Sequence, residues 1–174
     1  SDFVRVWELF IHGGPATKVD TNRSLAHRPH NRARRNEMKK HLARQPVRFT
    51  ALQARAIARG FADYVRRVGL VIYACAIMPD HVHLVIRRHT CSIESVATQL
   101  KGAATSRLIA EGLHPFADQP YRNGRLPTPW ARNEWKCFLW DSPDIARAID
   151  YADGNPEKAG LARQQWNCVT PFAD

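Results

Sequence analysis

Two histidines separated by one residue, His81 and His83, stand in the stretch MPDHVHLVI at residues 78–86. Alternate side chains of a β-strand point to the same face, so the two imidazoles share one face and Val82 points to the other. Imidazole is a common ligand of divalent metals, and two rings on one face can offer nitrogens to a single cation. Alternatively, both rings are satisfied by hydrogen bonds on a half-exposed face, which an isolated H-x-H pattern favours.

A tyrosine that could act as a nucleophile lies in the stretch RAIDYADGNPEKAGL at residues 147–161. Tyr151 and Asn155 are four residues apart, which places both on one face of a helix. Pro156 disfavours the helical conformation for the residue before it, so we expect the helix to end near Asp153 and Asn155 to cap a short turn starting at Pro156. For Tyr151, the alternative to a nucleophile is an amphipathic side chain packed at the helix edge. The other tyrosines lack the Asn-Pro context; they are Tyr64, Tyr73 and Tyr121.

The elements that would position these residues follow from apolar periodicity and from turn and capping signals. Thr50, Ser92 and Ser142 are expected N-caps, the last followed by a proline at the first helical position. Strands are predicted at 3–11, 70–78, 81–88 and 130–140, and helices at 50–69, 92–112 and 142–153, with 70–78 and 81–88 forming an antiparallel hairpin. This order predicts an α+β fold, a ferredoxin-like (split βαβ) sandwich with an antiparallel sheet.

The charge balance favours a polyanionic partner. The 174 residues include 26 Lys and Arg against 16 Asp and Glu, giving a formal charge of +10 and a pI near 10.0. We expect one domain over 1–174, with a basic arm at about 15–48 inserted after the first strand. The alternative is a solvated loop with no partner.

The cysteines and the hydropathy pattern bear on the compartment. The four cysteines include no C-x-x-C pair, which favours reduced thiols in a cytosolic protein. No leader sequence and no apolar stretch long enough for a membrane span are present, so we expect a soluble, cytoplasmic chain with no membrane partner.

Three stretches together resemble the HUH single-strand nucleases, specifically the single-tyrosine transposases of small insertion sequences and the REP-associated tyrosine transposases. They are MPDHVHLVI, EWKCFLWDSPDIARAIDYADGNPEKAGL and QQWNCVTPF. The resemblance implies that His81 and His83 are the metal-binding pair and that Tyr151 is the nucleophile. It makes Asn155 the third metal ligand, at a position that is Gln in many insertion-sequence members. Capping and ligation both stay open for Asn155.

The resemblance also implies the reaction and the partners. It predicts a prokaryotic, nucleoid-associated, Mg²⁺- or Mn²⁺-dependent single-stranded DNA endonuclease and strand transferase, which forms a 5′-phosphotyrosyl intermediate at hairpin or palindromic sequences. The enzyme is expected to be a monomer or a homodimer with exchanged helices, and the long C-terminal segment favours the monomer. We expect DNA contacts from Arg32, Arg34, Arg35, Arg87 and Lys101. Tyr121 and Trp130 could stack on bases, whereas Trp135 and Trp140 stand among apolar neighbours and are predicted in the core.

Three alternative functions remain. A non-catalytic DNA-binding protein could keep the fold and the basic surface, but it has no chemical need for His81, His83 and Tyr151 together. An HUH replication initiator or relaxase would share the chemistry, although the chain is short and has one plausible tyrosine. A metallohydrolase that uses only the histidine pair would form no covalent adduct with DNA.

Overall fold

The computed structural model describes residues 47–131, 134 and 136–173. The chain divides into two units, and all helices and strands named below belong to the unit of residues 47–134 and 140–174. Several predictions fall outside the described residues. They concern the strand at 3–11, nearly all of the basic arm, Trp135, and the expected DNA contacts Arg32, Arg34 and Arg35. The single-domain prediction stays a prediction.

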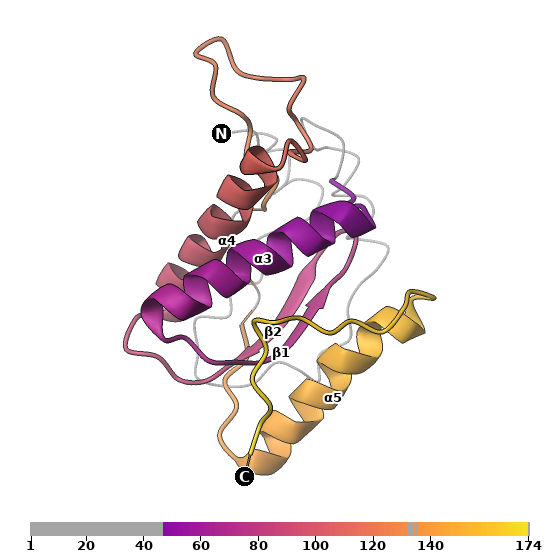
Figure 1. Cartoon of the computed structure of the whole chain (residues 1–174). Coiled ribbons are helices and arrows are strands. Elements are labelled where there is room, and N and C mark those ends of the chain that lie inside the picture. Colours follow the sequence, from indigo (N-terminus) through magenta and orange to yellow (C-terminus); the bar gives the residue numbers. More distant parts are fainter. Residues whose placement is uncertain (1–46, 132–133, 135, 174) are drawn as a thin grey trace, which may run out of the picture. The chain divides into compact units, whose positions relative to one another are not determined.

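The described residues form an α+β structure, as predicted. The element order is α3 (Ala51–Val68), β1 (Ile72–Ile77), β2 (Val82–Ile86), α4 (Ile93–Ala110) and α5 (Ser142–Lys158) (Figure 1). The two strands pair antiparallel, which confirms the predicted hairpin. In the described part of the chain, no helix is long and apolar enough to cross a membrane.

Capping residues fix the limits of the first two helices. The Thr50 side chain accepts a hydrogen bond from the Gln53 backbone, and the Gln53 side chain accepts one from the Thr50 backbone, which is a complete capping box. Gly69 ends α3 with φ of 68°, a left-handed conformation that suits glycine. Ser92 Oγ accepts from Ser95 N at the start of α4. The predicted N-caps Thr50 and Ser92 are therefore confirmed.

Alternation along the hairpin separates a core face from the histidine face. Cys75 pairs with Leu84, and Ile77 pairs with Val82, on the face that packs with α3 and α4. The largest side chains of this core come from the helices and the strands; they include Ile57, Phe61, Ile72, Leu100 and Leu108. The helices α3 and α4 also pack closely against each other, which makes a platform for one face of the hairpin.

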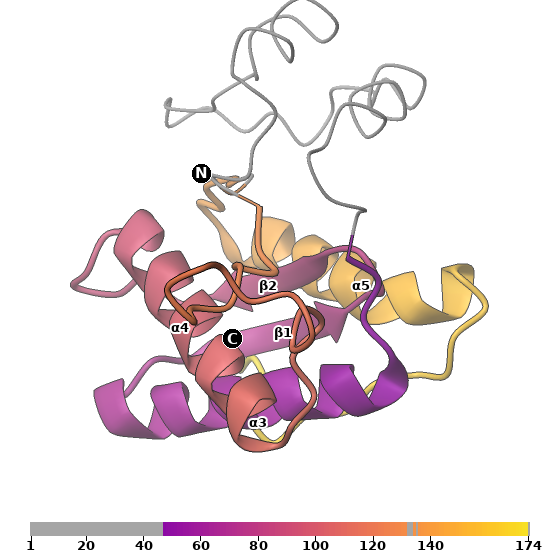
Figure 2. The ribbon, with the colours of Figure 1, turned by 90° about the horizontal axis from the view of Figure 1, so that it is seen from above.

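The other face of the hairpin carries His83 and small residues. Ala76 pairs with His83 in the register, and Ala74 and Ala76 are fully buried. Helix α5 packs on β1 and β2, with Ala152 1 % exposed. Figure 2 shows α5 and α3 on opposite sides of the two strands. The alanines leave room for the α5 backbone to approach the strands, and this brings α5 side chains beside the histidines.

The segment after α5 covers the free edge of β1. The Gln164 side chain brackets Ile77: Ile77 N donates to Gln164 Oε1 at 2.8 Å, and Gln164 Nε2 donates to Ile77 O at 2.9 Å. Val169 forms a parallel bridge with Ile72, and Thr170 N donates to Ile72 O at 2.8 Å. These bonds satisfy backbone groups that an exposed strand edge would leave unpaired.

The prediction of a strand over 130–140 is wrong for the residues described there, none of which is in a strand. Two aromatic residues of this segment, Trp130 and Trp140, differ in their surroundings. Trp130 packs on Phe49 with ring centroids 5.2 Å apart, and its Nε1 donates to Thr105 Oγ1 at 2.9 Å. Trp140 is 67 % exposed, so its prediction as a core residue is also wrong.

Helix α5 departs from its predicted limits at both ends. Its N-cap is Asp141, whose carboxylate accepts from Asp144 N at 2.7 Å, so Ser142 lies inside the helix. A carboxylate at this position also interacts favourably with the positive end of the helix dipole. At the other end the helix continues through Pro156 to Lys158. Burial of the Pro156 ring, which is under 2 % exposed, offsets the loss of one helical hydrogen bond.

Candidate active site

The two histidines converge as the strand pattern predicts. His81 Nε2 lies 3.0 Å from His83 Nε2, and the rings meet edge to face with centroids 4.7 Å apart. Both side chains are partly exposed at the start of β2, directly after a turn in which Met78 N donates to His81 O at 2.8 Å. The two Nε2 atoms are therefore within hydrogen-bonding distance of each other at the end of the hairpin.

The Asp80 carboxylate orients the first of these rings. His81 Nδ1 lies 2.7 Å from Asp80 Oδ1. An ionised carboxylate only accepts hydrogen bonds, so His81 Nδ1 is the donor in this contact. A carboxylate that holds the distal nitrogen of a metal-ligating histidine is a recurrent arrangement in metal sites. Sequence reasoning missed Asp80, although its place directly before His81 was a usable signal.

Tyr151 lies beside the histidine pair. The Tyr151 and His83 rings meet edge to face, with centroids 5.5 Å apart and planes at 86°. Tyr151 is 54 % exposed, so a large substrate can reach its hydroxyl. The structure thus brings together three residues singled out from the sequence, from two elements about seventy residues apart. An edge-packed tyrosine is not required to meet the H-x-H pair, so this contact favours the nucleophile interpretation.

Asn155 lies one helical turn after Tyr151 and does not cap a new turn. Its Nδ2 donates to the Tyr151 backbone carbonyl at 2.9 Å, within the continuous helix α5. The predicted capping role is therefore wrong, because the helix does not end before Pro156. The amide nitrogen is held by this bond, and the amide oxygen is the atom that can ligate a cation.

Lys158 is a second residue that sequence reasoning missed. Its Nζ lies 5.4 Å from the centroid of the Tyr151 ring. The spacing of seven residues, two helical turns, was the available signal. The immediate surroundings of Tyr151 thus include a lysine from its own helix and a histidine from the hairpin.

The geometry of the histidine pair fits a divalent cation. Neighbouring ligand atoms about 2.1 Å from an octahedral cation lie about 3 Å apart, which matches the 3.0 Å between the two Nε2 atoms. Imidazole nitrogens are common ligands of divalent metals, and a pair of them leaves further positions for other ligands. Within the described residues, no group of three or more His, Cys, Asp and Glu side chains could hold a metal.

The two expected DNA contacts that the structure describes differ in their surroundings. Arg87 is exposed just after β2. Lys101 Nζ donates to Glu134 Oε2 and to Ala131 O, both at 3.2 Å, so its charge is already paired. Of the two, Arg87 is the better placed to meet a phosphate backbone.

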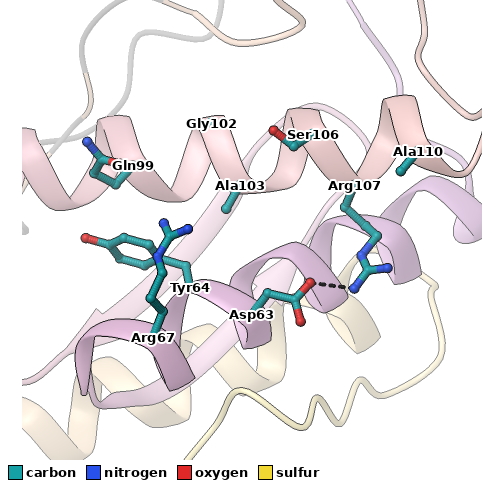
Figure 3. Close-up of a pocket in the computed structure, with 9 residues that line it drawn as sticks. All are labelled: Asp63, Tyr64, Arg67, Gln99, Gly102, Ala103, Ser106, Arg107 and Ala110. Atoms are coloured by element: carbon teal, nitrogen blue, oxygen red, sulfur yellow. Dashed lines mark hydrogen bonds and ion pairs between the residues drawn. The ribbon is translucent and has the colours of Figure 1, made fainter.

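A groove of about 450 Å³ lies between α3 and α4, and its lining does not include His81, His83 or Tyr151 (Figure 3). Its acidic residue, Asp63, is bound by Arg107 and Arg66, and the Arg107 hydrogen bond is the main cause of a lowered Asp63 pKa. Arg67 stacks on the Tyr64 ring at 5.5 Å. None of the residues that line the groove belongs to the histidine and tyrosine cluster, so we place the candidate active site at that cluster.

A comparison with protein families identifies the class of protein. Residues 35–141, more than half of the chain, match the family described as "Transposase IS200 like". The chain therefore belongs to the IS200-like transposase family, a family of DNA-cleaving enzymes. The matched range includes His81 and His83 and ends before Tyr151. No curated protein and no solved structure matches the chain.

Proposed function

We propose that this transposase is a metal-dependent single-stranded DNA endonuclease and strand transferase of the single-tyrosine HUH type, with Tyr151 as its nucleophile. The observation that carries the proposal is the contact between Tyr151 and His83, which joins a nucleophile to a pair of convergent metal-ligand nitrogens. Family membership supports DNA cleavage, and the site supplies a chemical means for it.

Mg²⁺ or Mn²⁺ is the proposed cofactor, held by His81, His83 and Asn155. When bound, such a cation polarises a phosphate oxygen and offsets charge that develops in the transition state. Asp80 keeps the His81 proton on Nδ1, so that Nε2 stays available. The partly exposed site admits a backbone phosphate.

Cleavage exchanges one phosphate ester for another. Tyr151 Oη loses its proton to solvent and forms a bond to phosphorus, the bond from phosphorus to the 3′ oxygen breaks, and that oxygen takes up a proton. The products are a 5′-phosphotyrosyl strand and a free 3′-hydroxyl. Because the ester bond is kept, the 3′-hydroxyl of another strand can attack the same phosphorus and release Tyr151, which completes strand transfer without an energy source.

The proposed substrate is single-stranded DNA beside a hairpin or palindromic element. The chain's charge of +10 favours a polyanion, and exposed Arg87, with Arg32, Arg34 and Arg35, would meet phosphates. Helix α5 packs on β1 and β2 of its own chain, which supports a site completed within one monomer. Repeated palindromes flanking the gene would favour the REP-associated branch over a self-mobile element.

An adduct assay tests the proposal. The protein is incubated with a labelled hairpin-bearing strand and Mn²⁺, and an SDS-resistant protein–DNA band is measured. We expect Tyr151→Phe to abolish the band and Tyr73→Phe, the same change in β1, to leave it. An undiminished band with Tyr151→Phe would refute the assignment, and binding of the strand without any band in wild type would indicate a non-catalytic DNA-binding protein.

Mixing two inactive variants tests the monomeric site. Tyr151→Phe and His83→Ala each lack one half of the chemistry. A site built within one chain stays inactive in the mixture, whereas a homodimer with exchanged helices regains about a quarter of its sites at full random exchange of equal amounts, and fewer when exchange is incomplete. Recovery of the adduct in the mixture would contradict the monomeric arrangement.

A further inference from the structure

Lys158 lies on the same face of α5 as the proposed nucleophile. It is the last residue of the helix, two turns after Tyr151, and long helical side chains lean toward the helix N-terminus. Its path passes Gly154: a Cβ built on Gly154 would lie 3.6 Å from both Cε and Nζ of Lys158. The lysine thus folds back along the helix, and its Nζ comes within 5.4 Å of the Tyr151 ring centroid.

The charge of Lys158 is available for a substrate. Among the residues that the structure describes, no carboxylate forms an ion pair with it, and the side chain is exposed. Two other cations are already in ion pairs: Arg147 of α5 pairs with Asp144, and Lys101 of α4 pairs with Glu134. A lysine ammonium is a compact charge with three donors on a flexible stem, which suits a phosphate oxygen at varying positions.

We propose that Lys158 is a further catalytic residue, which binds a non-bridging oxygen of the phosphate that Tyr151 attacks. This inference rests on the proposed function. A phosphate at Tyr151 Oη would lie within reach of Lys158 Nζ, because both residues are on the same face of α5. The ammonium stays protonated throughout, and its charge stabilises the negative charge that the attacking oxygen brings to the phosphate. A cation held by His81 and His83 at the hairpin and the Lys158 ammonium on α5 would thus act on the same phosphate.

A purely structural role predicts different behaviour. A cation in the last turn of a helix interacts favourably with the helix dipole, and the effect is small at an exposed position. Loss of that interaction would lower the melting temperature slightly and leave the chemistry intact. The chemical step must therefore be measured apart from DNA binding and from folding.

The test is the single-turnover rate of adduct formation at saturating hairpin DNA, with Kd measured separately in EDTA. We expect Lys158→Gln to lower the rate by about 10- to 100-fold, with little change in Kd, and Lys158→Arg to recover most of it. Arg163→Gln, which removes the same charge from an exposed position beyond α5, should keep the wild-type rate.

Three results would overturn the inference. They are a wild-type rate in Lys158→Gln, a defect confined to Kd with the saturated rate unchanged, and an equal loss in Arg163→Gln. All three presuppose that the wild type forms an adduct through Tyr151. Absence of that adduct refutes the proposed function itself, so the two failures are distinguishable.

Discussion

A close backbone approach of α4 to Gly60 in α3 makes an alanine at residue 60 destabilising. A Cβ built on Gly60 would lie 2.7 Å from Ala103 O and 2.8 Å from Ala104 Cα, so the two helices must move apart. Overpacking of this kind costs about 1–3 kcal/mol, and contact with backbone places Gly60→Ala at the upper end. Replacing a helical glycine recovers about 1 kcal/mol. The net expectation is a loss of about 2 kcal/mol, or a melting temperature lower by about 4–8 °C.

Gly102 provides the matched control on the facing helix. A Cβ built there meets nothing within 4 Å, so only the gain in helix propensity remains. We expect Gly102→Ala to raise stability by about 0.5–1 kcal/mol. Both variants are measured by urea unfolding and thermal melting followed by circular dichroism. Equal or greater stability of Gly60→Ala relative to wild type would refute the close packing that supports the hairpin.

Three further predictions concern the site and the pH dependence of folding. Asp80→Asn weakens the hold on His81 and is expected to lower Mn²⁺ affinity by about 10- to 100-fold in calorimetric titration; unchanged affinity would remove Asp80 from the metal site. Asn155→Ala should weaken Mn²⁺ binding while Asn155→Gln, which keeps the amide, retains part of it, and equal affinities in all three proteins would exclude a ligand role. Burial lowers the pKa of His114 below 6.5, so the unfolded chain takes up a proton more readily and the free energy of unfolding falls as pH drops below about 6.5. His114→Phe should flatten that dependence in urea unfolding at pH 7.5 and 5.5, and an unchanged slope would contradict it.

Local patterns predicted the histidine half of the site well. The two-residue period of a strand placed His81 and His83 on one face, and their nitrogens indeed lie 3.0 Å apart. The period works here because the opposite face, with Val82 and Leu84, is held in the core. The N-caps Thr50 and Ser92 were predictable because each capping side chain bonds to a backbone group three residues away, which requires no tertiary information.

Features that depend on tertiary packing were not predictable in this way. Pro156 has a local preference to end the helix, but burial of its ring prevails and α5 continues. Gln164 completes the edge of β1 through bonds to Ile77, 87 residues away in the chain. Trp140 has apolar neighbours in sequence yet is exposed, because adjacent residues do not determine which side chains a segment buries.

The tyrosine assignment lay between these cases. Sequence spacing put Tyr151 and Asn155 on one helical face, but only packing of α5 on the alanine-lined side of the hairpin brings Tyr151 to His83. The family match ends at residue 141, so this contact is an observation independent of it. The central claim, that Tyr151 becomes covalently joined to DNA, therefore requires a direct chemical test.

Mass spectrometry of the trapped adduct supplies that test. After nuclease treatment and trypsin digestion, cleavage following Arg147 and Lys158 releases residues 148–158, which contain one of the four tyrosines of the chain. We predict a phosphonucleotide mass on this peptide, localised to Tyr151 by fragmentation, in samples with Mn²⁺ and hairpin DNA. The same mass on a peptide carrying Tyr64, Tyr73 or Tyr121, with residues 148–158 unmodified, would contradict the account.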